Sequence, residues 1–239
     1  MLVAARSRLK DASALSMRRH LHVEHNPQIQ YYPHHADCQA GDAMGFSQAQ
    51  KAESRQRVLD VAARQIREHG LEALGVADCM RSAGLTHGAF YGHFSSREAL
   101  IRAALEQALT KGQTRLRSRT ADAAEHAKTP LEAIADAYLN PTHADNPGTG
   151  CALCALAGDA VHATADVKAL YTTYLRRLAE HLTQAAGSEN QAVGLGVVAT
   201  IAGAITLARA VDDRELALSI LAAAHALVMT QDDTARRMD

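Results

Sequence analysis

The stretch Ala83–Leu100, which reads AGLTHGAFYGHFSSREAL, decides the fold of this chain. It begins with a tight turn at Gly84, continues through small and aromatic residues over Thr86–Phe94, and enters a longer helix after Ser96. A serine followed by Arg-Glu supplies an N-cap and a first-turn acid for that longer helix. Two short helices joined by a glycine-containing turn are typical of a helix-turn-helix.

Regular apolar spacing predicts helices on both sides of the turn. The first helix is predicted over 54–69, with apolar residues at Val58, Leu59, Ala62, Ala63 and Ile66. Gly70 is expected to end it. A second, short helix is predicted over Val76–Ser82, and the helix that begins after Ser96 is expected to continue toward Arg119.

The segment Thr86–Phe94 has the composition that a recognition helix needs. Its outer face carries small residues: Thr86, Gly88, Ala89 and Gly92. Small residues would let such a helix approach base edges in the major groove of DNA. Phe90 and Phe94 are four residues apart and would pack the helix onto its neighbours. Tyr91 and His93 would then remain available for phosphates and bases.

The run from Arg57 to Leu109 resembles the DNA-binding domain of the TetR/AcrR family of bacterial transcriptional regulators. The resemblance covers about 55 of the 239 residues. It rests on an Ala-Gly-apolar-polar turn, a Tyr-x-x-Phe that ends the recognition helix, and a Ser-Arg-Glu-x-Leu start to the fourth helix. Two positions depart from the family pattern. Gly75 stands where the family most often has a capping threonine, so no hydroxyl is offered to phosphate there, and Cys79-Met80 replaces the usual apolar-Ala pair.

The resemblance implies which residues contact DNA. At matching positions these are Thr86, His87, Gly88, Ala89, Tyr91, His93 and Arg97. Tyr91 matches a tyrosine that contacts the DNA backbone, and Arg97 keeps a cation beside a phosphate with a forked set of donors. The family also implies a homodimeric repressor on a near-palindromic operator of double-stranded DNA, released by a small-molecule effector.

The charge of the chain divides into two parts of opposite sign. Overall there are 25 Lys and Arg residues against 26 Asp and Glu, a formal net charge of -1. Residues 46–119 hold 12 basic and 7 acidic side chains, whereas residues 120–239 hold 8 basic and 15 acidic ones. Such a division is expected when only one part of the chain meets a polyanion. Uneven sampling of surface charge would give the same numbers.

Composition and helical spacing predict an all-α fold of about nine helices. The chain is 47% hydrophobic, with no Trp and only 5 Pro, which points away from β-sandwiches. We expect a three-helix helix-turn-helix domain over 46–100, followed by a helical ligand-binding and dimerisation domain over 101–239. The helices of this second domain are predicted over 130–139, 151–162, 166–186, 189–210 and 213–229, with a loop over 140–150.

Residues 1–45 have no sustained helical period and are predicted to be a poorly ordered extension. Met44 opens a more regular stretch, so an internal translation start is one explanation. The alternative is a metal site built from the imidazoles and the thiolate of this segment: His20, His22, His25, His34, His35 and Cys38. Apart from this alternative we expect no metal, no cofactor and no catalytic residue, and therefore no enzyme.

The family resemblance implies that the second domain dimerises through its last two helices, about 189–210 and 213–229, and encloses a ligand pocket. The first of these helices is rich in Gly and Ala, which allows close approach of another helix. Packing within one subunit would use the same residues. Polar-tipped side chains are expected to line the pocket: Tyr138, Cys154, His162, Tyr171, Tyr174 and His181.

Cys151 and Cys154 leave alternative functions open. A C-x-x-C at the start of a helix can have one acidified thiol, which would suit a redox or electrophile sensor, although small buried cysteines also serve as packing. A small helical enzyme with a cysteine nucleophile is a further hypothesis, but no His-Asp or His-Asn partner can be placed by spacing.

The sequence indicates a cytoplasmic protein that does not cross a membrane. Four cysteines without a recognisable signal peptide fit a reducing compartment. The apolar stretch Ala192–Ala208 has 17 residues, which is fewer than the roughly 20 that a bilayer span requires.

Overall fold

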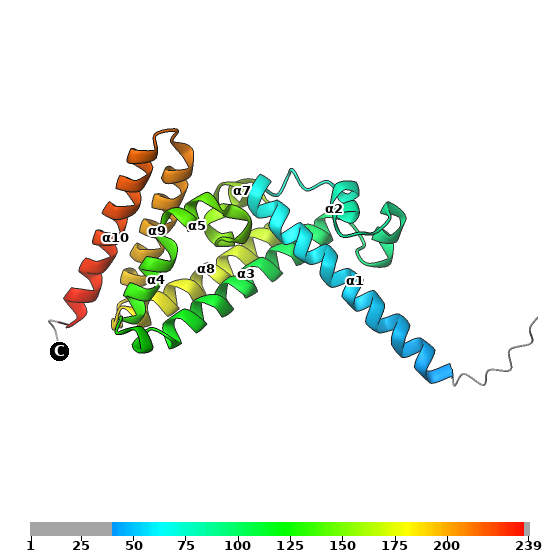
Figure 1. Cartoon of the computed structure of the whole chain (residues 1–239), viewed down its shortest axis with the longest axis horizontal. Coiled ribbons are helices and arrows are strands. Elements are labelled where there is room, and N and C mark those ends of the chain that lie inside the picture. The colour runs from blue at the N-terminus through cyan, green and yellow to red at the C-terminus, as the bar shows by residue number, and fades with distance from the viewer. Residues whose placement is uncertain (1–39, 237–239) are drawn as a thin grey trace, which may run out of the picture. The chain divides into compact units, whose positions relative to one another are not determined.

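The computed structural model describes the backbone of residues 40–236 and the side chains of residues 47–231. Residues 40–236 form an all-α fold, as predicted, with ten α-helices and three 3-10 helices (Figure 1). Every donor of the metal site considered for the N-terminal segment precedes residue 40 and lies outside the described residues. Most of the extension predicted over 1–45 lies outside them as well.

The N-terminal helices follow the predicted order: α1 (Ala40–His69), α2 (Val76–Ser82), η1 (His87–Gly92) and α3 (Arg97–Ala121). α1 begins well before the predicted residue 54. The residues just ahead of that point are mainly Ala, Gln, Lys and Glu, which have high helix propensity even where they bury little surface.

The predicted recognition helix is a 3-10 helix, η1. Its backbone bonds join residues three apart: the Ala89 N–H donates to the Thr86 carbonyl at 3.1 Å, and the His93 N–H donates to the Phe90 carbonyl at 2.9 Å. Gly88 lies in the middle of this short segment, and glycine disfavours the interior of an α-helix. The segment therefore forms a tighter turn than the pattern predicts.

The second domain contains the remaining helices. They are η2 (Ala124–His126), α4 (Pro130–Tyr138), α5 (Pro141–Asp145), η3 (Pro147–Thr149), α6 (Ala152–Ala155), α7 (Ala157–His162), α8 (Ala165–Ala185), α9 (Gln191–Ala210) and α10 (Arg214–Arg236). The ends of α8 and α9 lie within two residues of their predicted positions. α4 has its predicted cap, since the Glu132 N–H donates to the Thr129 hydroxyl at 3.1 Å.

The prediction of a loop over 140–150 is wrong, because this stretch contains α5 and η3. Asn140 Oδ1 accepts the His143 N–H at 2.9 Å and caps α5. The Asn140 Nδ2 group donates to two carbonyls of α4, at 2.7 and 3.0 Å. One side chain therefore ends α4 and starts α5. Pro141 occupies the first position of α5, where its missing N–H leaves nothing unsatisfied.

The single helix predicted over 151–162 is divided into α6 and α7 at Leu156. The backbone leaves the helical region at this residue, with φ -113° and ψ 11°, and the Leu156 side chain is almost completely buried. We attribute the break to this burial. Gly158 lies in the first turn of α7, and its low helix propensity favours a break nearby.

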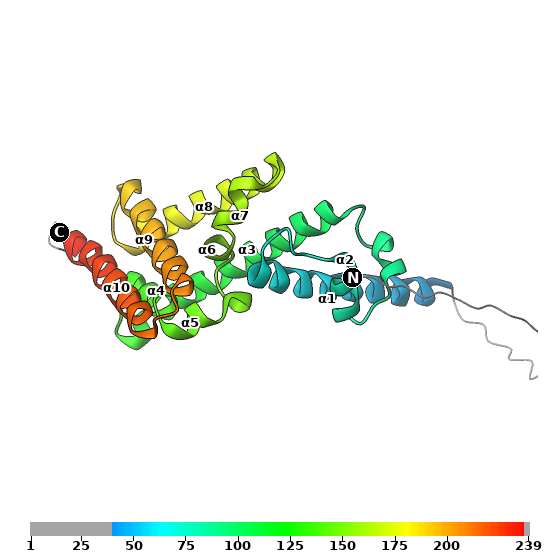
Figure 2. The ribbon, with the colours of Figure 1, turned by 90° about the horizontal axis from the view of Figure 1, so that it is seen from above.

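α3 joins the two domains as one continuous helix. It packs on α1 in the first domain and on α4, α6 and α8 in the second. α9 lies between α8 and α10 at the other end of the described region from α2 (Figures 1 and 2). Among the described helices only α9 is long and apolar enough to cross a membrane, on length and composition; here it packs against α8 and α10.

Candidate nucleic-acid interface and candidate ligand cavity

A buried aromatic pair holds η1 on the first domain. Phe90 and Phe94 are 2% and 5% exposed, and their rings stack with centroids 5.9 Å apart. Gly84 makes the turn before η1 with φ +74°, a conformation that carries no Cβ penalty in glycine. The turn and the aromatic pair direct one face of η1 inward, so the opposite face is left to solvent.

The outward face of η1 is an exposed row of small and hydrogen-bonding residues: Thr86, His87, Gly88, Tyr91 and Gly92. Tyr91 is 73% exposed. A Cβ added at Gly88 or Gly92 would meet no atom within 4 Å, so packing inside the described part of the chain does not require glycine there. Ala89 is half-buried behind the row. This exposed row has the low profile that close approach to a major groove needs.

His93 lies beside the exposed row in a basic environment. Its Nδ1 atom is buried and has no hydrogen-bond partner among the described residues. Burial, and then the charges of Lys51 and Arg55, lower the pKa of His93, so the ring is neutral at neutral pH. The Arg55 guanidinium also lies over the Phe94 ring, 5.0 Å from its centroid. Two cations of α1 therefore lie close enough to His93 to lower its pKa.

Arg97 has structural contacts within the chain. Its guanidinium donates to the backbone carbonyls of Leu71 at 3.1 Å, Glu72 at 2.7 Å and Leu74 at 2.9 Å. The Glu72 carboxylate lies 3.6 Å from the same group. Arg97 thus ties the start of α3 to the link between α1 and α2. A phosphate contact from Arg97 stays a prediction.

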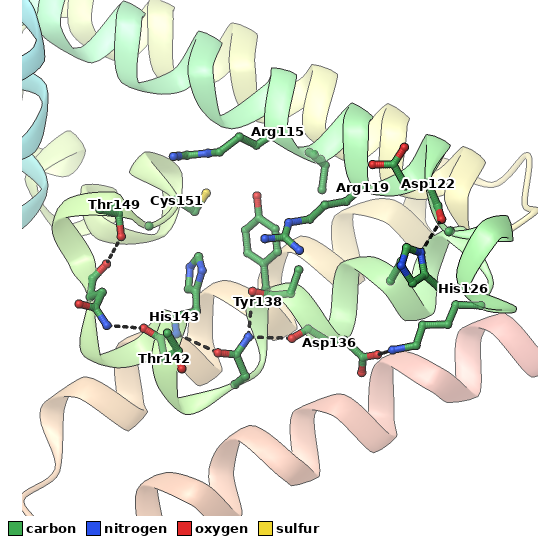
Figure 3. A pocket seen from close by; sticks show the side chains of 18 residues that line it. Arg115, Arg119, Asp122, His126, Asp136, Tyr138, Thr142, His143, Thr149 and Cys151 are labelled. Atoms are coloured by element: carbon green, nitrogen blue, oxygen red, sulfur yellow. Dashed lines mark hydrogen bonds and ion pairs between the residues drawn. The ribbon is translucent and has the colours of Figure 1, made fainter.

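A cavity of about 770 Å³ opens in the second domain between α3, α4 and the segment that leads into α6. Arg115 and Arg119 reach it from α3, while Tyr138 and His143 point into it from the opposite side (Figure 3). Cys151 closes one end. A volume of this size is within the range of pockets that hold small molecules.

The cavity has a positive electrostatic environment. Burial, followed by the charges of Arg209, Arg115 and Arg119, lowers the pKa of His143 to about 4. His143 is therefore neutral near pH 7, and its buried Nε2 atom finds no hydrogen-bond partner in the described region. The His143 ring lies against Tyr138, with centroids 4.8 Å apart.

Cys151 and Cys154 are buried free thiols at the start of α6. The hydrogen bond with Cys154 lowers the pKa of Cys151, and the backbone N–H groups of Cys154 and Leu153 add to this effect against the opposing effect of burial. The same bond and burial raise the pKa of Cys154. Cys151, which lines the cavity, is thus the more acidic thiol of the pair.

Four of the side chains predicted for the ligand pocket gather in one region. Tyr138 lines the cavity and also borders two small voids of about 20 and 30 Å³ behind it. Tyr174 borders the first void and shares a 2.7 Å hydrogen bond with the Thr110 hydroxyl. Cys154 and Tyr171 border the second void.

The two predicted histidines lie apart from this region. His162 is exposed on α7 and lines a separate cleft of about 810 Å³ that faces the first domain. His181, on α8, lies 3.4 Å from the Thr120 hydroxyl. The structure therefore does not bring either histidine to the cavity beside Tyr138.

Hydrogen bonds connect the end of α1 and the link that follows it to the second domain. Arg67, on α1, donates from Nε to the Gly148 carbonyl at 2.8 Å. The Leu71 N–H donates to Asp159 Oδ1, on α7, at 2.8 Å. Gly148 directly precedes Thr149, which lines the cavity. The C-terminal end of α1 is thus attached to the cavity wall.

α9 and α10 each leave an apolar face uncovered. The exposed residues of α9 recur at spacings of one, three and four: Ala192, Leu195, Gly196, Ala199, Gly203, Thr206, Leu207 and Ala210. On α10, Leu216, Leu218 and Leu227 are exposed. A Cβ at Gly203 would meet no atom within 4 Å, whereas a Cβ at Gly194 would overlap α8 at the Ala179 carbonyl. Close packing within the chain therefore accounts for Gly194 and does not account for Gly203.

Sequence reasoning missed several residues of both sites. Arg115 and Arg119 form an i, i+4 pair of like charges on a predicted helix, and this pattern could have identified them. His143 carried no usable signal, because its stretch was predicted as a loop. Lys51 lies ahead of the predicted first helix. Among the side chains of residues 47–231, no group of three or more His, Cys, Asp or Glu residues could hold a metal ion.

The fold and the exposed row define a helix-turn-helix protein of the DNA-binding class, with a second, helical domain that contains a cavity. Residues 58–104 match the family described as bacterial regulatory proteins, tetR family. An uncharacterized HTH-type transcriptional regulator of Bacillus subtilis (strain 168), YvdT, is 36% identical over 64 residues, which are 27% of this chain and 33% of that protein. The match thus spans about a third of that relative's length.

Solved structures extend the likeness to most of the chain. A TetR transcriptional regulator from Chloroflexus aurantiacus J-10-FL has a TM-score of 0.64 at 22% identity, over 76% of this chain and 95% of that one. The reduced form of E. coli NemR has a TM-score of 0.60 at 19% identity, over 73% and 95%. Residues 58–104 thus match the family model of tetR regulatory proteins, and the fold of the described residues is similar to that of solved TetR regulators.

Proposed function

We propose that this protein is a ligand-responsive repressor that binds a near-palindromic DNA operator as a homodimer. The observation that carries the proposal is the exposed row on η1, which combines Tyr91, Thr86 and His87 with two glycines that no packing requires. His93 lies beside the row, and the charges of Lys51 and Arg55 lower its pKa, which adds two cations to this region. Small residues beside bases and cations beside phosphates are the two requirements of a groove-binding element.

The uncovered faces of α9 and α10 support a dimer. Leu207 is 57% exposed and Leu227 is 55% exposed, on adjacent helices that pack against each other. A second copy of this chain could cover these faces and form a four-helix interface. Two copies would also present two recognition elements, as a palindromic site requires.

The contacts between the domains support a response to a ligand. A molecule in the cavity would contact the segment that carries Thr149 and Cys151, next to the Gly148 carbonyl held by Arg67 of α1. Any displacement of this segment would act on α1 and therefore on the spacing of the two recognition elements. Operator release is in this account a shift in population between two arrangements and involves no catalysis.

Selection of binding sequences from a random duplex library tests the proposal, followed by gel shift at fixed salt. The expected result is a near-palindromic sequence whose two halves lie about one helical turn apart. Selection of no sequence above background, or of one unpaired half-site, would refute the dimeric repressor. The proposal places the protein in the cytoplasm, with DNA.

A second candidate function is thiol-based sensing by the same regulator. The observation that favours it is the position of Cys151, the more acidic thiol of the pair, at the wall of the cavity. If this function is correct, treating the protein with diamide will release DNA from the wild type and not from Cys151→Ala. Equal release from both proteins, or none from either, excludes it.

A further inference from the structure

We infer that the cavity beside Tyr138 binds a small organic carboxylate with a compact apolar body, and that Arg115 and Arg119 hold its anionic group. The inference deepens the proposed function, since it names the class of effector and rests on the cavity being the effector site. Binding to the protein alone can nevertheless be measured without DNA.

The charge of the cavity selects an anion. Arg115 and Arg119 are one helical turn apart on α3 and both line the cavity. Neither guanidinium has a hydrogen bond or an ion pair with any residue that the structure describes. Two like charges at this spacing repel each other and weaken the helix, so an anion between them would relieve the repulsion.

The other charged groups of the lining have partners of their own. Lys128 forms an ion pair with Asp136, which also accepts a 2.8 Å hydrogen bond from His225. Asp122 accepts from the Ser118 hydroxyl at 3.3 Å. The Ser118 hydroxyl does not neutralise the Asp122 carboxylate. The lining therefore carries three cations, Arg115, Arg119 and Lys128, against two carboxylates, Asp122 and Asp136, and its charge of +1 favours an anion over a cation.

The geometry favours a carboxylate among anions. A guanidinium presents two parallel N–H groups that match the two oxygens of a carboxylate. The buried Nε2 of neutral His143 also lacks a partner, and buried polar atoms generally have one. As the tautomer that is protonated at Nε2, His143 would donate a further hydrogen bond to the ligand. The lining thus offers several donors to one acceptor group.

The remaining surface favours an apolar body of limited length. The Tyr138 and His143 rings form an aromatic platform, and Leu116 and Ala137 add apolar area. The voids behind Tyr138 hold only about 20 and 30 Å³, so a long chain could not extend past this ring. Inorganic phosphate would leave most of the 770 Å³ unfilled. The ligand class is therefore an aromatic, alicyclic or short acyl carboxylate.

Isothermal titration of the full chain with matched probes tests this inference. The probes are benzoate, phenylacetate, cyclohexanecarboxylate and hexanoate, each paired with its neutral amide at equal ionic strength, together with benzylamine and inorganic phosphate. We expect at least one carboxylate to bind at least tenfold more tightly than its amide. Benzylamine and phosphate should not bind measurably.

Variants locate the binding to the two arginines. Arg115→Gln and Arg119→Gln should each weaken that carboxylate at least tenfold and leave its amide unchanged. Arg117→Gln is the matched control, because Arg117 is exposed on the same helix and does not line the cavity. Circular dichroism melting confirms that each variant is folded. Equal binding of every carboxylate and its amide, or unchanged binding in both arginine variants, would overturn the inference.

DNA binding is measured separately, so the two proposals fail independently. If the protein binds its selected operator and no carboxylate binds, this inference is wrong and the regulator remains. If a carboxylate binds through Arg115 and Arg119 but does not alter operator affinity, the site is correct and the proposed response is wrong.

Discussion

At the scale of single residues, substitutions at the glycines of η1 should change DNA affinity without lowering the stability of the fold. Neither Gly88 nor Gly92 has a positive φ, and neither has an atom within 4 Å of an added Cβ. Gly92→Ala should therefore leave the free energy of unfolding unchanged or raise it by up to about 1 kcal/mol. Affinity for the selected operator should fall at least tenfold, because the added methyl group enters the space needed by the groove. Urea unfolding and gel shift measure the two effects; an unchanged affinity would place the DNA elsewhere.

Arg97 is expected to stabilise the fold whatever its contact with phosphate. Its side chain donates to three carbonyls of the link between α1 and α2. Arg97→Ala should lower the free energy of unfolding by about 2 kcal/mol, because those carbonyls lose a charged donor. Arg97→Lys should recover only part of the loss, since an ammonium lacks the fork. If urea denaturation of Arg97→Ala matches the wild type, the three bonds contribute nothing.

His143 makes stability depend on pH in a defined direction. Burial and the cations Arg209, Arg115 and Arg119 lower its pKa from 6.5 to about 4. The unfolded chain therefore binds a proton between about pH 6.5 and pH 4 that the folded chain does not bind, and stability falls as the pH falls through this window. His143→Gln should lose less melting temperature than the wild type between pH 7 and pH 4.5. An equal loss in both proteins would show that other groups account for the acid sensitivity.

At the scale of elements, the sequence predicts helices well where their stability is local. The positions of α2, α8 and α9 follow from apolar periodicity and nearby caps. α5 was missed although Asn140-Pro141 is a cap followed by a favourable first residue, because four Pro and Gly residues in the same stretch favoured a loop. The break at Leu156 depends on long-range burial and leaves no periodic signal.

The same reasoning explains which site residues could be predicted. The exposed row of η1 lies within one short local motif, so a single stretch of sequence identifies Thr86 to Tyr91. The cavity is built from α3, α4, α5 and the start of α6, which are separated in the sequence. Its lining depends on how these helices pack, and so only Tyr138 was both predicted and found to line it.

The bond between α7 and the link that follows α1 gives a test of communication between the domains. The Leu71 N–H donates to Asp159 Oδ1 at 2.8 Å. Asp159→Ala removes the acceptor, whereas Asp159→Asn keeps an oxygen that can accept the same bond. We expect Asp159→Ala to bind the operator. The factor by which the effector lowers operator affinity should be at least five times smaller in this variant than in the wild type. Asp159→Asn should retain the wild-type response in gel shift. Equal responses in both variants would rule out this contact as the connection.

At the scale of the whole molecule, the division of charge corresponds to a division of structure. The basic segment 46–119 contains α2, η1 and most of α1 and α3, whereas the acidic segment 120–239 contains α4 to α10. The near-neutral total therefore combines a domain suited to a polyanion with one that would be repelled by it. Within the basic segment, Arg115 and Arg119 belong to the cavity, so not all of the positive charge serves DNA.

The oligomeric state tests the uncovered faces of α9 and α10. Leu207→Glu places a charge on an apolar face that is 57% exposed in one chain, and should weaken dimerisation at least tenfold while the monomer stays helical. Gly194→Ala is the contrasting variant, because its methyl group would overlap α8 and should destabilise each chain by about 1–3 kcal/mol. Light scattering across a concentration series measures the first effect and thermal melting the second. A Leu207→Glu protein that remains dimeric would show that these faces are not the interface.

The central claim is that the exposed row of η1 lies against DNA, and site-specific photo-crosslinking tests it most directly. With p-benzoyl-phenylalanine in place of Tyr91, irradiation of the complex with the selected operator should attach the protein to the duplex. The same group in place of Lys168, an exposed residue of α8, should give no such product. Crosslinking from position 168 and not from position 91, in a complex of unchanged affinity, would contradict the account.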